Sequence, residues 1–440
     1  MKHISMIAGF VLLAAPPGLS AADKMGFFFG SDPLPAGWTR VSTDTHYTKE
    51  RGFGFEEGAT LVAGPRGVSS ETPFFFSVRV PVEGNYRVSV MVGDARAEST
   101  TTIKAELRRL MVEKIHTDAG KFTLVSFIVN TRTPHIAATG DIKAGDVKLK
   151  TPRETTQEAW AWDDAITLEF SNTHPAIASI EIEKVENLPT IFLIGDSTVC
   201  DQSREPYNSW GQMFTRWFSS DVAVANHGES GETYRDSIGR RRLDKILSVM
   251  KPGDFLLMQF GHNDQKQIAA GTGGPFTTYK AELKRHVDGV RARGGIPIVV
   301  SPMERRGFDA DGKVKPSLIE YANAAREAAK ELGVAFIDLN AMSKPFYEAL
   351  GPQKSAVAFA QPSPGNVDNT HHDNYGSYEL AKCVVQSIRD QKLPLAKFIV
   401  DDFKGFDPAK PDDPDAFSVP PSPLVTTQRP LGDEANASKK

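Results

Sequence analysis

Residues 190–198 have the sequence TIFLIGDST, an unbroken apolar run that ends in Gly-Asp-Ser-Thr. A short apolar run bounded by turn residues is typical of a buried strand. An open parallel sheet carries its chemistry just beyond the carboxyl ends of its strands. Ser197 therefore lies where a nucleophile is expected, although a Gly-Asp-Ser turn by itself is also an ordinary turn. The rest of the sequence has to decide between these two interpretations.

Four further apolar runs follow this stretch, and helix-like segments separate them. The runs are VAVAN (222–226), DFLLMQFG (254–261), IPIVVS (296–301) and VAFIDL (334–339). Near-continuous apolar and β-branched runs joined by helices indicate a parallel sheet that is covered on both faces. We predict an α/β domain over residues 188–402, closed by a last helix near residues 376–391.

The first half of the chain has a different pattern, in which short runs alternate apolar and polar residues. The runs are FSVRVPVEGNYRVSVMV (76–92), TTIKAELRRLMVEKI (101–115), KFTLVSFIVN (121–130), AITLEF (165–170) and IASIEIEKV (177–185). Short strands at this spacing predict an antiparallel β-sandwich over residues 24–186. Residues 403–440 are rich in Pro, Asp and Ser, so we expect a C-terminal tail with little regular structure.

Residues 1–22 have the pattern of a secretory signal peptide. Lys2 and His3 form a short basic start, residues 7–15 are apolar, and residues 20–22 are small enough for cleavage. The apolar run is shorter than the roughly 20 residues of a membrane-spanning helix, and no cysteine follows it. We therefore expect no membrane anchor and a secreted or periplasmic protein.

Composition argues against several classes of partner. The chain has 51 Lys+Arg against 55 Asp+Glu and no long run of one sign, which disfavours binding to nucleic acid or to a charged membrane surface. Cys200 and Cys383 are its two cysteines, and either one disulfide or two buried thiols fits them. No zinc or iron–sulfur spacing is present, so no metal is implied. The oligomeric state stays open.

Three other polar stretches follow predicted strands or precede the last helix. NHGESGET (226–233) follows the second run, GHND (261–264) follows the third, and DNTHHD (368–373) precedes the helix. Loops at the carboxyl ends of parallel strands converge on one crevice. Each stretch alone has an ordinary explanation as a turn or a helix cap. Their order on successive loops favours one site that they share with GDST.

The residue types at this edge fit acyl transfer from an ester to a serine. Ser197 needs a neighbouring base to take its proton, and His371, oriented by Asp368 three positions before it, fits that role. The tetrahedral intermediate needs hydrogen-bond donors where its oxyanion forms. The candidates are the backbone N–H groups of Ser197 and Gly231 and the side-chain amide of Asn263. Gly231 has no Cβ, so its backbone can approach a substrate closely.

As a set, GDST, Gly231, GHND and DNTH resemble the four sequence blocks of the SGNH or GDSL hydrolases. Within them, residues 190–391 look most like the rhamnogalacturonan acetylesterases of carbohydrate esterase family 12. The resemblance implies a three-layer, flavodoxin-like fold and no metal or organic cofactor. It also implies a triad of Ser197, Asp368 and His371, and an oxyanion hole formed by Ser197, Gly231 and Asn263. Residues 24–186 resemble the galactose-binding-like sandwiches that precede some bacterial members.

Four residues near the predicted site have side chains that suit a sugar. They are Tyr207 and Trp210, after the serine, and Arg305 and Arg306, after the fourth run. Aromatic faces suit sugar rings, and the guanidinium fork of arginine suits a uronic carboxylate. Trp210 is equally well explained as a core residue at the start of a helix.

These observations predict a secreted serine esterase, and the resemblance implies that it removes O-acetyl groups from a pectic polysaccharide, namely rhamnogalacturonan. A second interpretation keeps the triad and changes the ester, for example to acetylated xylan, a lipid or a thioester. A third is an inactive carbohydrate-binding protein, which the intact Ser/Gly/Asn/His set disfavours. The sequence leaves open which sugar position carries the acetyl group and whether the sandwich binds glycan.

Overall fold

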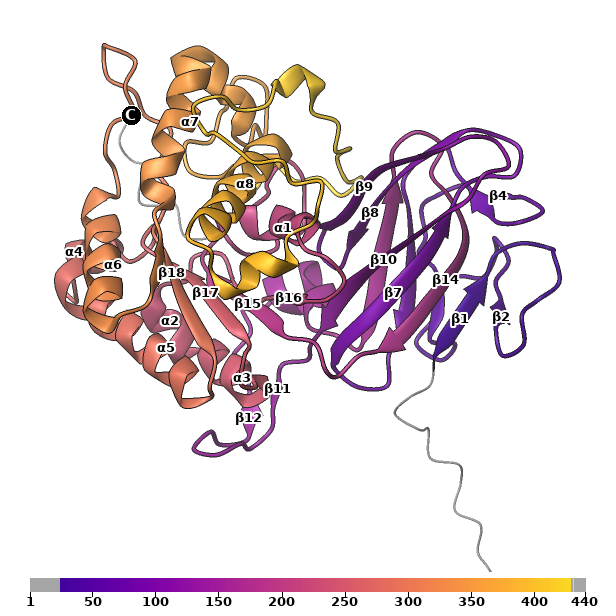
Figure 1. Cartoon of the computed structure of the whole chain (residues 1–440), viewed down its shortest axis with the longest axis horizontal. Coiled ribbons are helices and arrows are strands. Elements are labelled where there is room, and N and C mark those ends of the chain that lie inside the picture. The colour runs from indigo at the N-terminus through magenta and orange to yellow at the C-terminus, as the bar shows by residue number, and fades with distance from the viewer. Residues whose placement is uncertain (1–23, 429, 431–440) are drawn as a thin grey trace, which may run out of the picture.

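The computed structural model describes residues 24–428 and residue 430, so the predicted signal peptide at residues 1–22 lies outside the described residues. Figure 1 shows a β-rich part formed by the first half of the chain beside an α/β part formed by the second half.

The β-rich part is a sandwich of two sheets. The strands of the first sheet are β1 (Met25–Phe28), β2 (Thr39–Arg40), β4 (Val62–Ala63), β5 (Val68–Ser69), β7 (Gly84–Val92), β10 (Thr123–Thr131) and β14 (Ala176–Lys184). The strands of the second are β3 (Phe53–Phe55), β6 (Phe74–Arg79), β8 (Ser99–Ala105), β9 (Arg109–Thr117) and β13 (Ala165–Ser171). The first sheet has the order β10-β7-β14-β1-β2, with β5 beside β14 and β4 beside β5, and the second has the order β3-β6-β13-β8-β9. All pairs are antiparallel except β1 with β2. Buried side chains such as Phe27, Phe76 and Val90 form one core cluster in this sandwich.

The alternating run at residues 101–115 forms parts of two strands, because the chain turns there between β8 and β9. Glu106 and Arg108 take left-handed backbone conformations, with φ values of 56° and 65°. The Glu106 carboxylate accepts a hydrogen bond from the Thr167 N–H at 3.2 Å, and Arg108 donates to backbone carbonyls of the α/β part. Distant contacts therefore stabilise a turn that no glycine or proline marks in the sequence.

Residues 132–164, here called the connecting segment, leave the sandwich between β10 and β13. The segment contains the short strands β11 (His135–Ile136) and β12 (Gly145–Asp146) and helical turns at Arg153–Gln157 and Ala159–Ala161. Its side chains Ile136, Val147 and Trp162 are buried in one core of the α/β part. Leu110 of β9 joins the other core. The two parts therefore share apolar cores.

The α/β part contains the five predicted parallel strands. They are β15 (Thr190–Gly195), β16 (Ala223–Asn226), β17 (Phe255–Gln259), β18 (Ile296–Val300) and β19 (Ala335–Ile337). The sheet order is β16-β15-β17-β18-β19. The helices are α1 (Trp210–Phe214), α2 (Tyr234–Gly239), α3 (Arg242–Val249), α4 (Lys266–Ala269), α5 (Lys280–Ala292), α6 (Ile319–Leu332), α7 (Leu339–Lys354) and α8 (Asn374–Asp390). The last helix, predicted near residues 376–391, is α8.

The side chains of β15 show why this part has three layers. Ile191 and Leu193 belong to a core cluster with α1, α7 and α8, whereas Phe192 and Ile194 belong to a cluster with α3, α5 and α6. Successive residues of a strand point to opposite faces, so an all-apolar strand needs helices on both sides. The predicted fold class is confirmed.

Residues 403–428 belong to the predicted tail and contain one short helical turn at Pro414–Ala416 and otherwise irregular backbone. The segment is nevertheless packed against both parts of the protein. Val419 is buried, Lys104 donates to the Pro420 carbonyl at 2.8 Å, and the Glu205 N–H donates to the Leu424 carbonyl at 2.8 Å. Figure 1 shows this segment, in yellow, passing from α8 toward β9.

Candidate active site

Ser197 lies in a tight turn directly after β15, and the turn is held by hydrogen bonds. The Asp196 carboxylate accepts the N–H of Thr198 at 2.9 Å and its hydroxyl at 2.7 Å. Burial opposes ionisation of Asp196, but His262 and these hydrogen bonds keep its pKa below the usual value. The Ser197 carbonyl accepts a hydrogen bond from Gln202 Nε2 at 2.7 Å. These contacts fix the position of the serine.

His371 connects Ser197 to Asp368. Its Nε2 lies 2.9 Å from Ser197 Oγ, and its Nδ1 lies 3.0 Å from Asp368 Oδ2. An ionised carboxylate only accepts hydrogen bonds, so Nδ1 carries the proton and Nε2 can accept one from the serine hydroxyl. Asp368 Oδ1 also accepts the N–H groups of Thr370 and His371, at 2.8 and 3.0 Å. This arrangement can activate a hydroxyl for attack on an ester.

His372, the neighbour of His371, faces a different environment. Its Nε2 lies 2.8 Å from the Tyr347 hydroxyl, and its ring packs against those of Tyr347 and Phe359. Burial lowers its pKa to about 3, so the ring is neutral at neutral pH. The two adjacent histidines therefore have different partners.

The loop with Gly231 and the Asn263 side chain are joined by a direct contact. Gly231 has a φ of 76°, a left-handed conformation that favours glycine. Asn263 Nδ2 donates to the carbonyl of Glu232, the next residue, at 3.1 Å. An amide NH₂ has two hydrogens, so Asn263 keeps a second one for another acceptor.

The four predicted sugar-contacting residues are placed differently from one another. Tyr207 is beside the triad, with its ring at 90° to that of His371 and a centroid distance of 5.8 Å, but its side chain is 1% exposed and offers no face to a sugar. Arg305 Nε donates to Thr370 Oγ1 at 3.0 Å, one residue from His371. Arg306 instead donates to the Pro352 carbonyl, in the last turn of α7, and to Ser355 Oγ just beyond it.

Trp210 is a core residue, and the interpretation that it contacts a sugar is wrong. Its side chain is 1% exposed within a core of the α/β part, and its indole N–H donates to Gln259 Oε1 at 2.8 Å. A ring packed in this way offers no face to a sugar, so the core explanation is the right one.

Several residues that hold the serine loop come from the sandwich and were not predicted. Arg108 donates to the carbonyls of Gln202 and Tyr207 at 3.1 and 2.8 Å and forms an ion pair with Glu205 at 2.5 Å. Arg109 forms another ion pair, at 2.7 Å, with Asp201 of the same loop. No local pattern could have found these pairs, because about a hundred residues separate each arginine from its partner.

Among the described residues there is neither a disulfide nor a cluster of metal-binding side chains. Cys200 and Cys383 are buried free thiols. Between residues 24 and 428, and at residue 430, no group of three or more His, Cys, Asp or Glu side chains could hold a metal ion. The helices found in that part of the chain are too short or too polar to cross a membrane.

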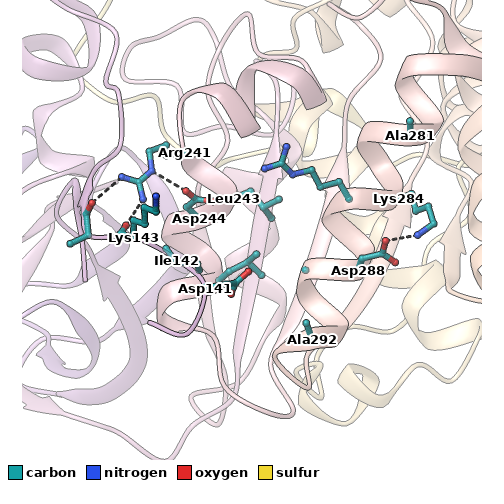
Figure 2. Close-up of a pocket in the computed structure, with 14 residues that line it drawn as sticks. Asp141, Ile142, Lys143, Arg241, Leu243, Asp244, Ala281, Lys284, Asp288 and Ala292 are labelled. Carbon is teal, nitrogen blue, oxygen red and sulfur yellow. Dashed lines mark hydrogen bonds and ion pairs between the residues drawn. The ribbon is translucent and has the colours of Figure 1, made fainter. Parts of the chain in front are cut away.

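A cavity of about 820 Å³ lies away from the triad (Figure 2). The loop at residues 141–144 and helices α3 and α5 surround it. Among its charged side chains, Arg241 pairs with Asp244 and Lys284 pairs with Asp288. Because no triad residue lines this cavity, it is separate from the candidate active site.

The sequences of known proteins support an ester-hydrolysing site in the α/β part. The sequence model of the GDSL-like Lipase/Acylhydrolase family matches residues 193–360. Rhamnogalacturonan acetylesterase RhgT of Bacillus subtilis (strain 168) is 40% identical over 220 residues, which cover 48% of this chain and 94% of that protein. The probable rhamnogalacturonan acetylesterase YesY of the same organism is 33% identical over 214 residues, which cover 48% of this chain and 97% of that protein. The crystal structure of YxiM from Bacillus subtilis is similar with a TM-score of 0.45 and 22% identity, over 84% of this chain and 99% of that one.

RhgT is matched over nearly its whole length. The residues of this chain that match the family model include the serine turn, Gly231 and Asn263. The chain belongs to the GDSL-like lipase/acylhydrolase family and is a carboxylic-ester hydrolase.

Proposed function

We propose that this protein is a serine esterase that removes O-acetyl groups from a pectic polysaccharide, with acetylated rhamnogalacturonan as its substrate. The observation that carries the proposal is the hydrogen-bonded series Ser197–His371–Asp368. The names of RhgT and YesY, which are 40% and 33% identical to this chain, support the choice of substrate.

In this mechanism, His371 Nε2 takes the proton of Ser197 as Oγ attacks the acetyl carbonyl carbon. Asp368 holds the ring and stabilises its positive charge. The oxyanion accepts hydrogen bonds from the N–H groups of Ser197 and Gly231 and from the Asn263 amide. His371 then returns the proton to the sugar oxygen, which leaves as a hydroxyl group. A water molecule, deprotonated by His371, then attacks the acetyl-serine, and His371 returns this proton to Ser197 Oγ as acetate leaves.

Arg305 is the proposed contact for an acidic sugar. It is bonded to Thr370, beside His371, so its guanidinium lies near the triad loop. A guanidinium can bind the carboxylate of a uronic acid through two parallel hydrogen bonds.

A substrate panel tests this proposal. Acetate release is measured from acetylated rhamnogalacturonan, acetylated xylan, a long-chain ester and p-nitrophenyl acetate. The highest kcat/KM among the natural-type substrates is expected for acetylated rhamnogalacturonan. A higher value for acetylated xylan or for the long-chain ester would retain the esterase and reject the pectic substrate. No hydrolysis of any ester would favour an inactive carbohydrate-binding protein.

Export is part of the proposal and rests on the sequence pattern of residues 1–22. N-terminal sequencing of the protein recovered outside the cytoplasm is expected to show cleavage near residue 22. An intact Met1 on protein that stays in the cytoplasm would contradict export.

A further inference from the structure

The loop that carries Gly231 is contacted by two cations from the connecting segment. Lys150 and Arg153 lie between β12 and β13, outside residues 193–360 that match the family. Both side chains are largely buried, with 15% and 14% exposed. They reach residues 229–232 of the α/β part, across about 80 positions of the chain.

Lys150 contacts the peptide group that contains the Gly231 N–H. Its Nζ donates to the carbonyl oxygen of Ser230. The Ser230 C=O and the Gly231 N–H belong to one planar trans peptide, so they point in opposite directions. An ammonium group bound to this carbonyl therefore fixes the direction of the Gly231 N–H. It also polarises the peptide, which makes the N–H a stronger donor.

Arg153 holds the same peptide through a hydrogen bond to the side chain of Ser230. Its Nη2 donates to Ser230 Oγ at 2.8 Å, and its Nε lies 3.3 Å from Glu229 Oε1. Gln202, which donates to the Ser197 carbonyl, also reaches Ser230 Oγ with its Nε2 at 3.3 Å. The hydroxyl of Ser230 thus links the loop of the nucleophile to the loop of Gly231.

Lys150 does more than neutralise the charge of Glu232, because other cations also lie near that carboxylate. Glu232 has no exposed side chain and lies 2.9 Å from Lys150 Nζ, but Arg240 and Arg242 also approach it, at 3.2 and 3.7 Å. Loss of the Lys150 ammonium would leave Glu232 with two cations. The Ser230 carbonyl would lose its ammonium donor.

We propose that Lys150 and Arg153 are positioning residues for ester hydrolysis, which hold the Ser230–Gly231 peptide with its N–H directed at the oxyanion. This inference rests on the proposed function, because it assumes that Gly231 donates to the oxyanion. It assigns to the connecting segment a part in the catalytic step.

The test measures kcat and KM of Lys150→Met and Arg153→Gln on p-nitrophenyl acetate. The oxyanion exists only in the transition state and the intermediate, so loss of its donor lowers kcat and leaves KM nearly unchanged. Misplacement of a group by 1 Å can cost about 100-fold, and we expect kcat to fall by about 10- to 100-fold. Lys150→Arg, which keeps a cationic donor, should recover most of the loss.

Lys245→Met is the matched control. Lys245 is also a buried ammonium at the junction of the two parts, where it donates to Glu83 and to the His135 carbonyl and not to the 229–232 loop. Its kcat should stay within about twofold of the wild-type value. An equal fall in Lys245→Met would show that any lost junction charge has the same effect, and would overturn the inference.

Ser197→Ala separates failure of the inference from failure of the proposed function. If Ser197→Ala retains activity, the proposed function is wrong and the inference falls with it. If Ser197→Ala is inactive and both Lys150→Met and Arg153→Gln keep the wild-type kcat, or change KM alone, only the inference is wrong. If either cation variant fails to fold, Ser230→Ala decides, because it removes the hydroxyl contacts without removing a charge. Its kcat should fall several-fold, and an unchanged kcat would contradict the inference.

Discussion

His371 Nε2 lies 2.9 Å from Ser197 Oγ although 174 positions separate the two residues, whereas Nε2 of the adjacent His372 lies 2.8 Å from the Tyr347 hydroxyl. Neighbouring residues in an extended loop direct their side chains to different sides. One imidazole can therefore serve the serine while the other packs in the core with a pKa of about 3.

This difference predicts opposite results for two variants. His371→Ala should lower kcat on p-nitrophenyl acetate by about 10⁴-fold or more, because triad members act as a unit. His372→Gln, which can still bond the Tyr347 hydroxyl, should keep kcat within about tenfold, because packing and not proton transfer is changed. An inactive His372→Gln beside an active His371→Ala would show that the base is misassigned.

Arg305 should contribute more to the binding of acidic polymers than to the binding of small esters. Arg305→Gln is expected to raise KM for acetylated rhamnogalacturonan by about 10-fold or more, since a charged hydrogen bond contributes about 1.5–3 kcal/mol. KM for p-nitrophenyl acetate, which has no carboxylate, should change little. Arg306→Gln is the control, because its guanidinium is bonded to Pro352 and Ser355. Equal changes on both substrates would argue that Arg305 only supports the Thr370 loop.

The strands and helices of the α/β part could be predicted from the sequence, because each is indicated by a local pattern of residues. The run at residues 190–195 becomes β15, and the last predicted helix becomes α8. The order of GDST, Gly231, GHND and DNTH along the chain was enough to predict that their loops meet, since parallel strands end at one edge.

The contacts between the two halves could not be predicted in the same way. Periodicity gives the face of a strand but not its partner in another part of the protein, so neither the turn at Glu106–Arg108 nor its contacts with the serine loop left a signal. Trp210 had two interpretations, and only its position in the core, bonded to Gln259, decided between them.

Arg108 should contribute strongly to stability. Its ion pair with Glu205 has side chains that are 2% and 9% exposed. Removing one partner of a buried pair leaves the other charge uncompensated, which costs about 3–5 kcal/mol. Urea unfolding of Arg108→Met should show this loss, whereas Arg79→Met should lose about 1 kcal/mol or less, because its pair with Asp164 is 56% and 46% exposed. Equal losses would contradict the proposed importance of the junction.

His286 should make the protein less stable as the pH falls. Burial lowers its pKa to about 4, and Nδ1 donates to the Glu282 carbonyl. The unfolded chain takes up a proton near pH 6.5 and the folded protein only near pH 4. Stability is therefore fully present above about pH 6.5 and falls by about 3 kcal/mol toward pH 4. The difference in unfolding free energy between wild type and His286→Gln should shrink over this range. A constant difference would show that His286 does not titrate in this way.

The most direct test of the account is acetate release from acetylated rhamnogalacturonan by the wild-type protein and by Ser197→Ala. The hydroxyl of Ser197 is the group that the proposed mechanism requires to form the acetyl intermediate. We expect the wild type to release acetate and Ser197→Ala to lose about 10⁴-fold or more in kcat, with an unchanged Tm. A folded Ser197→Ala that releases acetate at nearly the wild-type rate would contradict the account.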